Sequence, residues 1–276
     1  MRKQRHRQRR TNLKRIRQAF DQGALRRIAQ MPEEDFAAAF DMEVVPVPQR
    51  WPADYYCYRD NGSNVLAVAH LDTVVERELR QCNFLNTAAG PVVYSPALDD
   101  RLGAYIILDL LPKLGITYDI LLTVGEESGE STAAFFDPPK QYDWIIEFDR
   151  GGSDVVMYQY DDEDTRDLVK DSGARVGEGS FSDIAYLEHL GVKAFNWGTG
   201  YQDYHSVRSH AYLDDTFDMV DHFLSFAAAN DGVQMPHTHQ ERIFVDPDNW
   251  DWMDKDPDSW TGEDWEKWDE RVVMGL

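Results

Sequence analysis

Histidines and carboxylates recur along the chain at points where apolar, strand-like segments give way to polar loops. In chain order they are His70-Leu71-Asp72, Asp99-Asp100, Glu126-Glu127, Asp149 and His205. Two histidines and several carboxylates can together hold a pair of divalent metal ions. Because such ions activate water and polarise carbonyl groups, the set predicts metal-dependent hydrolysis.

The first pair follows the apolar segment VLAVA. Side chains two positions apart on a strand point the same way, so His70 and Asp72 share one side. His70 can then ligate a metal while Asp72 orients its ring as a supporting group. A His-x-Asp pair alone is more often incidental, so this pair needs the others.

The next two motifs each have a structural explanation as well. Asp99-Asp100 opens the helical segment DRLGAYIILDLL, where aspartate is a favoured cap. The functional alternative is a carboxylate that bridges two metals. Glu126-Glu127 ends the apolar run ILLTVG and could simply lie in a solvated loop. Adjacent acids beside a buried strand are costly without a facing positive charge, so one could bind a metal while the other acts as a base.

Asp149 and His205 are the weakest signals taken singly. Asp149 ends the apolar segment WIIEF, where a strand-to-turn cap would explain it, and His205 lies in a polar loop. The conjunction is more informative, because carboxyl ends of several strands converge at one edge of an open α/β sheet. Three carboxylates and a bridging hydroxide would also balance the charge of two divalent ions.

Five segments in this order resemble the metal-site motifs of the co-catalytic dizinc exopeptidases, a clan of zinc aminopeptidases, carboxypeptidases and deacylases. They are AHLDTV, SPALDDRLG, TVGEESGE, IIEFDRGG and YHS. LDDRLG and GEESGE are most similar to the glutamyl and tetrahedral aminopeptidase branch. The resemblance spans about residues 55 to 230.

The resemblance implies a role for each residue. His70 and Asp149 would bind one metal, Glu127 and His205 the other, and Asp99 would bridge both. Asp72 would hold His70, Glu126 would be the general base, and Arg101 would support the bridging region. Zinc is the expected metal, and cobalt or manganese would also suit these ligands.

The spacing departs from that family. The aminopeptidase branch inserts a lid domain between its first histidine and its bridging aspartate, but His70 and Asp99 are only 29 positions apart. Other members insert a dimerisation domain before the last histidine, whereas Asp149 and His205 are 56 positions apart. We therefore expect a reduced catalytic domain whose loops form the substrate pocket; an oligomer remains open.

Composition limits the class of protein. With 276 residues, 42% of them hydrophobic, the chain can build one sizeable α/β core. Two cysteines do not make a disulfide framework, which favours a cytoplasmic location. No apolar run is long enough for a bilayer, so no membrane partner is expected. The net charge of −22 makes nucleic-acid binding improbable outside the basic arm.

Charge also divides the chain. Residues 1–17 form a basic arm without acids, which could contact phosphate groups or an acidic surface, or could simply be solvated. Residues 18–235 form the predicted metallohydrolase domain. Residues 236–276 form an acidic extension with five tryptophans, which could be an ordered strap or could dock on a partner.

Periodicity predicts the elements that must position the site. Helical spacing occurs over 12–41, 101–111, 182–189 and 214–229, with Pro112 ending the second. Strand-like segments occupy 55–58, 65–69, 90–94, 118–124, 144–148, 155–158 and 192–197. Their alternation predicts a three-layer α/β fold, with a mixed, mostly parallel sheet between helices.

The remaining histidines are weaker ligand candidates. His210 was weighed against His205, which fits the YHS motif better. His189, His222 and the pair His237 and His239 are more simply read as packing or surface residues. Tyr201, Tyr204 and Arg208 flank His205 and could contact substrate. The Phe181-Ser182-Asp183 turn resembles a substrate-side loop of the family, and a helix cap by Ser182 would explain it equally well.

The leading hypothesis is a metal-dependent aminopeptidase acting on short peptides. An N-acyl amino acid deacylase or a carboxypeptidase would use the same centre on an acylated amino acid or a peptide. A non-catalytic binding or scaffold protein could also keep this fold, although no ligand position is occupied by an inert residue.

Overall fold

The computed structural model describes residues 2–48, 54–76 and 80–238, with side chains from residue 9 onward. The chain divides after Thr238 into two units, and the described residues belong to the first. The tryptophan-rich segment 246–271 and His239 lie outside the described residues. The predicted limits of the catalytic domain, 18–235, therefore stay a prediction.

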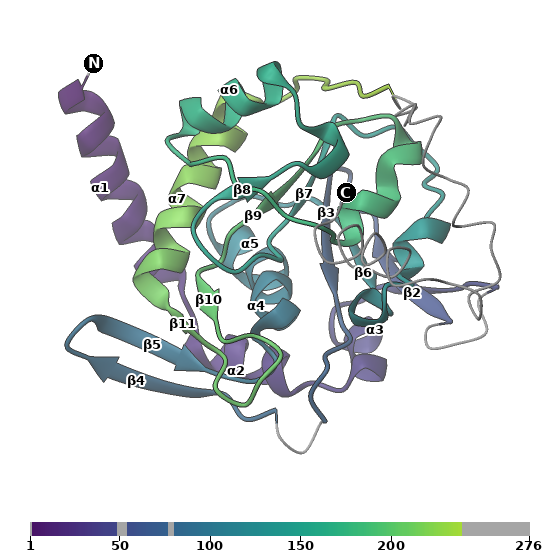
Figure 1. Cartoon of the computed structure of the whole chain (residues 1–276), viewed down its shortest axis with the longest axis horizontal. Coiled ribbons are helices and arrows are strands. Elements are labelled where there is room, and N and C mark those ends of the chain that lie inside the picture. Colours follow the sequence, from purple (N-terminus) through teal and green to yellow (C-terminus); the bar gives the residue numbers. More distant parts are fainter. Residues whose placement is uncertain (1, 49–53, 77–79, 239–276) are drawn as a thin grey trace, which may run out of the picture. The chain divides into compact units, whose positions relative to one another are not determined.

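A central sheet forms the middle layer of the described domain (Figure 1). Its strand order is β1-β2-β6-β3-β7-β9-β8. The strands are β1 (Glu43–Pro46), β2 (Tyr55–Arg59), β3 (Val65–His70), β6 (Asp119–Thr123), β7 (Trp144–Glu147), β8 (Val155–Val156) and β9 (Ala194–Trp197). The neighbours β6, β3, β7 and β9 run parallel, and the outer pairings are antiparallel. The predicted α/β fold with a mixed, mostly parallel sheet is confirmed.

The parallel strands are covered on both faces. Every residue of β3, β6, β7 and β9 is buried, which explains why these segments read as continuous apolar runs. A strand that faced solvent on one side would alternate apolar and polar residues instead. The carboxyl ends of the four strands consequently lie together at one edge of a well-packed layer.

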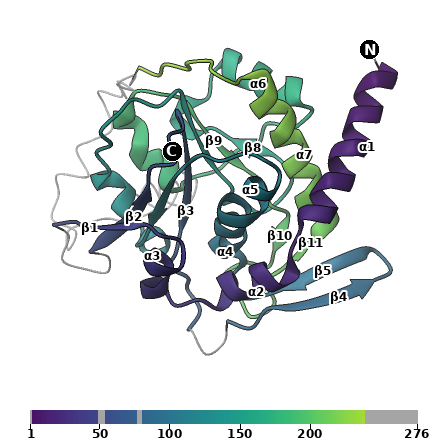
Figure 2. The same ribbon diagram turned by 180° about the vertical axis from the view of Figure 1, so that it is seen from behind.

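One face of the sheet packs against α7 (Leu213–Ala229) and α4 (Leu98–Tyr105), which continues through a π-helical segment (Ile106–Leu110) into α5 (Leu111–Lys113) (Figure 2). Phe223 meets Phe148 and Trp197 edge to face, with ring centroids 5.1 and 5.4 Å apart. Phe226 packs in the same way on Trp144, at 5.4 Å. Such pairs add to the burial energy of the rings, so this face carries much of the core.

The opposite face is covered by the 3-10 helices η5 (Thr132–Phe135) and η7 (Asp183–Leu190). Here the strands contribute polar side chains to the interior. The Ser182 hydroxyl donates to the carboxyl group of Glu147 at 2.5 Å, and the Thr123 hydroxyl donates to Asp183. All four residues are fully buried. Ser182 makes no side-chain capping bond, so its predicted role as a helix cap is wrong: the hydroxyl serves Glu147 instead.

A second, smaller sheet lies beside the first and has the strand order β10-β11-β5-β4. It joins β4 (Asn83–Thr87) and β5 (Gly90–Tyr94) to β10 (Tyr201–Gln202) and β11 (His210–Tyr212). The segment between His70 and Asp99 is therefore occupied by a hairpin, not by a separate domain. Ser95 N also donates to Ser209 O at 3.1 Å, which ties this hairpin to the loop that carries His205.

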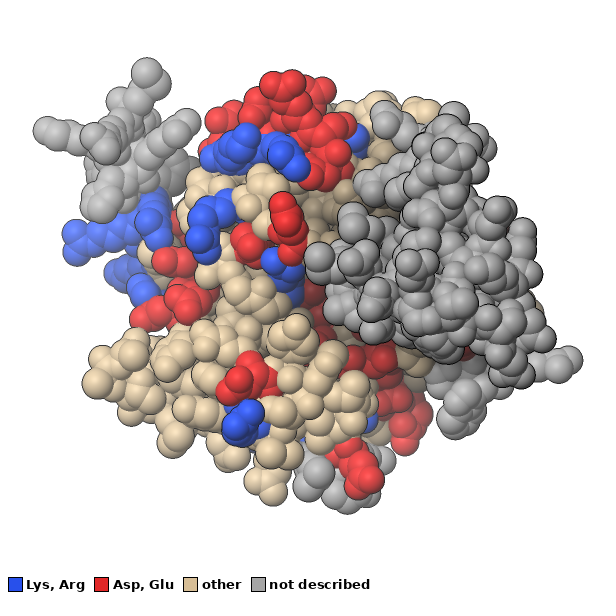
Figure 3. All heavy atoms as spheres, viewed as in Figure 1, with Lys and Arg blue, Asp and Glu red and all other residues tan. Residues whose placement is uncertain are grey.

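The predicted basic arm is the first part of a helix, α1 (Arg2–Ala19). Arg9 pairs with Asp218 of α7 at 2.9 Å, and Arg17 pairs with Asp214 at 3.0 Å. Figure 3 shows basic side chains gathered over α1 and acidic ones over α6 (Glu163–Ser172). Two arginines of the arm, Arg9 and Arg17, thus pair with acidic residues of α7.

The predicted helical region 12–41 is interrupted. After α1 the chain forms α2 (Gln22–Gln30), η1 (Glu33–Asp35) and α3 (Phe36–Ala39). Asp21 accepts hydrogen bonds from Gly23 N and Ala24 N, and this capping starts a new helix at Gln22.

Other predicted elements differ from the structure in their ends or in their type of helix. The strand expected over 155–158 stops at Val156 and gives way to η6 (Tyr158–Tyr160). The segment 182–189 forms a 3-10 helix, not an α-helix. The helix expected to stop at Pro112 ends one residue later, at Lys113.

Both cysteines, Cys57 and Cys82, are buried and free. Among the described helices, none combines the length and the apolar character that crossing a bilayer would require.

Candidate metal centre

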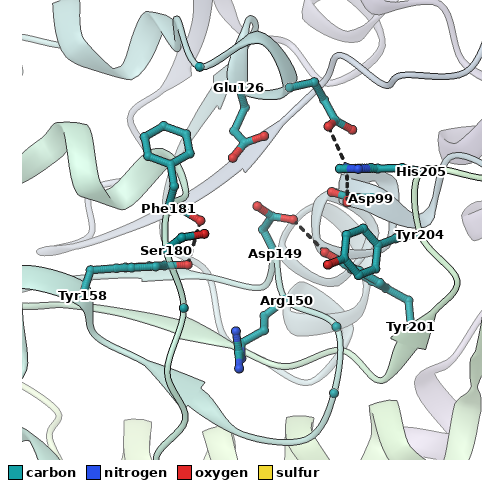
Figure 4. A pocket seen from close by; sticks show the side chains of 15 residues that line it. Asp99, Glu126, Asp149, Arg150, Tyr158, Ser180, Phe181, Tyr201, Tyr204 and His205 are labelled. Atoms are coloured by element: carbon teal, nitrogen blue, oxygen red, sulfur yellow. Dashed lines mark hydrogen bonds and ion pairs between the residues drawn. The ribbon is translucent and has the colours of Figure 1, made fainter. Parts of the chain in front are cut away.

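The five motifs converge near the carboxyl edge of the parallel strands. Figure 4 shows side chains from four of them, Asp99, Glu126, Asp149 and His205, around one pocket. His70 is the last residue of β3, and Asp149 lies two residues beyond β7. After β6, Gly125 turns the chain with a φ of +88°, and Glu126 and Glu127 follow in the 3-10 helix η4 (Glu126–Ser128). The backbone at Gly125 lies in the left-handed region, which glycine enters without steric cost.

Asp99 lies between the two histidines. Its Oδ1 is 3.1 Å from His70 Nε2, and its Oδ2 is 3.2 Å from His205 Nε2. Asp99 is 7% exposed, at the start of α4, and its peptide bond to Asp100 is cis. Each oxygen of one carboxylate thus faces a different imidazole, which is the arrangement that a bridging ligand requires.

The other carboxylates divide between the same two histidines. Glu127 Oε2 lies 2.8 Å from His205 Nε2. Asp149 Oδ1 lies 3.7 Å and Glu126 Oε2 lies 3.8 Å from His70 Nε2. The structure therefore brings together all the metal-site residues that the sequence predicts, in two groups that share Asp99.

The donor set fits divalent metal ions. Potential ligand atoms of His70, Glu126 and Asp149 lie within 4.8 Å of one another, as do those of His70, Asp99 and Glu127. The buried Glu127 Oε1 has no hydrogen-bond partner among the described residues, so it is available as a metal ligand. Four carboxylates crowded beside two imidazoles need added positive charge to stay ionised together.

The pKa values of the side chains in this cluster reflect the same crowding of carboxylates. Burial raises the pKa of Glu126 to about 9, that of Glu127 to about 7 and that of Asp149 to about 6. Burial alone would lower the pKa of His70, but Asp149 and the other neighbouring carboxylates raise it well above its usual value. Without metal, protons supply the positive charge that this cluster lacks.

Asp72 supports two parts of the cluster. Its carboxylate accepts from Glu127 N at 3.1 Å and, more weakly, from Glu126 N at 3.4 Å. His70 Nδ1 contacts the Asp72 carbonyl oxygen at 2.9 Å, whereas the Asp72 carboxylate is 3.5 Å away. Asp72 thus orients His70 chiefly through its backbone, and its side chain fixes the two glutamates.

Asp149 has supporting contacts that the sequence did not indicate. Tyr201 Oη donates to Asp149 Oδ1 at 3.1 Å. Asn196, in β9, accepts from Asp149 N at 3.0 Å and donates to Asp149 O at 2.8 Å. The only sequence signal for Asn196 was one polar residue inside the apolar segment AFNW.

His205 lies in the loop between β10 and β11 with a φ of +56°. A non-glycine residue rarely adopts this left-handed backbone, and strained positions of this kind concentrate at functional sites. The His205 side chain is 46% exposed, whereas that of His70 is fully buried. The two halves of the cluster therefore differ in their access to solvent.

The cluster opens into a cavity of about 710 Å³. Asp99, Glu126, Glu127, Asp149 and His205 line it; the other wall residues include Arg150, Tyr158, Ser180, Phe181, Tyr201 and Tyr204. The exposed rings of Phe181 and Tyr204 supply apolar surface. The sequence anticipated Tyr201 and Tyr204 as wall residues but did not anticipate Tyr158 or Ser180.

The other histidines have separate partners. His210 Nδ1 contacts Arg208 O at 3.0 Å, and His222 Nδ1 contacts Ser172 O at 3.2 Å. His189 Nε2 contacts Phe136 O at 2.8 Å, and His237 Nε2 contacts Glu188 at 2.8 Å. These side chains take part in local packing, away from the described cluster.

Arg101 is fully buried behind the cluster. Its guanidinium lies 4.5 Å from the centre of the Phe36 ring and 3.8 Å from Glu33. These contacts join α4 to the segment that follows α2. Arg101 does not line the cavity described above, and its predicted support of the bridging region stays a prediction.

Comparisons with solved structures identify the fold. A tripeptidase from Staphylococcus aureus is 11% identical, with a TM-score of 0.52 over 78% of this chain and 97% of that chain. The aminopeptidase PepT from Bacillus cereus is also 11% identical, with a TM-score of 0.53 over 76% and 100%. No protein-family model and no curated protein matches the sequence. The described domain therefore shares its α/β fold with these two peptidases, the kind of fold that its five motifs predicted.

Proposed function

We propose that this protein is a metal-dependent hydrolase of amide bonds, and specifically an aminopeptidase that acts on short peptides. The observation that carries the proposal is the position of Asp99, with one carboxylate oxygen facing His70 and the other facing His205. A peptidase fold of this kind supports the same reaction class.

Two divalent ions would be held by the residues already described. His70 and Asp149 would hold one, Glu127 and His205 the other, and Asp99 would contact both. When bound, the ions lower the pKa of water and polarise the carbonyl group of the substrate. Zinc suits this mixture of imidazole and carboxylate, and cobalt or manganese would also fit.

Glu126 is the proposed general base. Glu127 Oε2 lies 2.8 Å from His205 Nε2, whereas Glu126 Oε2 lies at a longer distance, 3.8 Å, from His70 Nε2. Glu126 lines the cavity on a loop whose backbone is fixed by Asp72. A carboxylate held in place with only this long contact can take a proton from water and return it to the leaving amine.

The test combines metal analysis with activity. The purified protein should bind close to two zinc ions, and Asp99→Asn should reduce this number because each half loses a ligand. Hydrolysis of alanyl-alanine amide should stop on chelation and return with zinc. Fewer than one bound ion per chain, with no hydrolysis, would favour a binding or scaffold protein.

A deacylase or carboxypeptidase would use the same residues. Comparing peptide amides with N-acetylated amino acids separates these activities, because an aminopeptidase requires a free amino group beside the scissile bond. Cleavage of the N-acetylated series alone would replace the aminopeptidase assignment and keep the metal centre.

A further inference from the structure

One wall of the cavity carries a positive charge that the proposed hydrolysis does not use. Arg150 directly follows Asp149 and is the only lysine or arginine among the described residues that line this cavity. In Figure 4 its side chain extends away from Glu126 and His205. Tyr158 and Ser180 lie along the same side of the pocket in this figure.

The guanidinium of Arg150 is held by three hydrogen bonds. Nε donates to Asp154 Oδ1 at 2.6 Å, and Nη2 donates to Asp154 Oδ2 at 3.3 Å and to Glu178 O at 2.8 Å. These bonds use three of the five N–H groups. Nη1 donates no hydrogen bond to any residue within the described ranges, so its two N–H groups remain for a ligand.

The chain beside Arg150 is shaped by two glycines. A Cβ atom at Gly177 would lie 2.3 Å from Asp154 Oδ2, and one at Gly179 would lie 3.1 Å from Arg150 Nη1. Glycine at both positions lets the segment before Phe181 lie directly against the ion pair. The arginine is therefore enclosed on one side by backbone and is oriented before any ligand arrives.

Asp154 orients the guanidinium but does not take up all its hydrogen-bonding capacity. The side chains of Arg150 and Asp154 are 22% and 24% exposed, so water still reaches the pair. Arginine N–H groups held in a fixed plane favour carboxylates, because the hydrogen bonds are charge-assisted. The carboxylates of the candidate metal centre repel an anion, so they cannot bind a carboxylate in this way.

We propose that Arg150 Nη1 binds a carboxylate of the substrate. The inference rests on the proposed function, because it places this carboxylate in the same cavity as the scissile amide. The favoured substrates are then short peptides or acylated amino acids that carry a free carboxylate near the bond to be cleaved. Two sources share this chemistry: the α-carboxylate at the end of the substrate and an acidic side chain.

Two substrate pairs distinguish the sources. Alanyl-alanine and its amide differ only in the α-carboxylate, and glutamyl-alanine amide and glutaminyl-alanine amide differ only in the side-chain charge. The zinc-loaded protein should show at least about tenfold higher kcat/KM for the charged member of one pair, chiefly through KM. Equal rates within both pairs would overturn the inference.

Variants separate binding from a structural role. In Arg150→Gln the preference for the charged member should fall to within about twofold, while hydrolysis of the neutral member persists. Arg150→Lys should restore part of the preference, because it keeps the charge. Asp154→Asn is the matched comparison: it breaks the same ion pair and loosens the guanidinium but keeps Arg150, so the preference should fall less than in Arg150→Gln. Equal losses on all substrates in both Arg150→Gln and Asp154→Asn would mean that Arg150 only ties loops together.

Calorimetry separates this inference from the proposed function. N-acetylalanine should bind at least about tenfold more tightly than its amide, and Arg150→Gln should remove the difference. If the protein hydrolyses none of the four peptides, the proposed function fails, and this binding comparison alone decides the carboxylate subsite. Equal binding of both ligands would reject the subsite even in an active enzyme.

Discussion

The two faces of the central sheet are equally buried but are built from different chemistry. On the α7 face, Trp144 and Phe148 of β7 and its extension meet aromatic rings edge to face. On the η7 face, the intervening Glu147 meets Ser182, and Asn196 holds the backbone of Asp149. The apolar face provides stability, whereas the polar face positions the cavity. The comparison predicts that damage to each face will have a different measurable effect.

The largest effect is expected at the polar edge. Glu126→Gln should lower kcat by about 1000-fold, because the variant keeps the shape of the side chain but cannot accept a proton. Zinc content and melting temperature should stay close to those of the unmodified protein. Steady-state kinetics with metal analysis checks this, and a variant that retains full activity would remove Glu126 from the role of base.

A mutation on the apolar face should do the reverse. Phe223→Ala removes a fully buried ring that contacts Phe148 and Trp197, so the free energy of unfolding should fall by about 3–5 kcal/mol. Denaturant unfolding measures the loss. The KM of the folded fraction should change little; a large change in KM would show that the two faces are coupled.

The metal-free cluster should make stability depend on pH. The pKa values of Glu126, Glu127 and Asp149 are raised by burial, so the folded chain binds extra protons there. As pH rises from about 5 to about 9 these protons are lost and the free energy of unfolding falls. The raised pKa of His70 acts in the same direction.

Thermal melts of chelated protein should therefore show a decrease on the order of 5 °C or more across that range. Saturating zinc should reduce the decrease, because the metal replaces the protons. A melting temperature that rises with pH in the chelated protein would contradict the assignment of these shifts.

The smallest effect is expected behind the cavity wall. Ser182→Ala leaves the buried Glu147 without its hydroxyl partner, which should cost about 1–3 kcal/mol of stability. Because Ser182 follows the wall residue Phe181, KM should rise a few-fold while kcat is maintained. Ser182→Thr, which keeps the hydroxyl, provides the control. Equal KM values in Ser182→Ala and Ser182→Thr would show that the contact with Glu147 does not affect substrate binding in the cavity.

The elements that could be predicted from the sequence are mainly those with a buried apolar face. Continuous apolar runs predicted β3, β6 and β7, and apolar residues spaced with a period of 3.6 predicted α7. In contrast, β4 is largely exposed and β10 has two residues, so neither has a hydrophobic pattern to detect. The helix α6 was not predicted; it is short and largely solvated, and it buries only Thr165 and Val169.

His70, Glu127 and Asp149 were predictable as neighbours because each lies at or just after the end of a parallel strand, and these ends meet at one edge. Asp99 and His205 adjoin the small sheet and were predicted from their motifs. Their supports were not. The bonds from Asp72 to the backbone of Glu126 and Glu127 join residues more than fifty positions apart. Whether Glu147 is buried or exposed likewise depends on a partner, Ser182, that local sequence does not identify. Contacts between distant polar groups need the folded arrangement.

The small sheet has a mechanical consequence for the site. Through the pairing of β5 with β11, the hairpin that precedes Asp99 and the strand that follows His205 form one unit. His70 and Asp149 belong to the large sheet instead. The candidate centre therefore spans both sheets, and the distances from His70 and Asp149 to Asp99 and His205 depend on how the two sheets pack against each other.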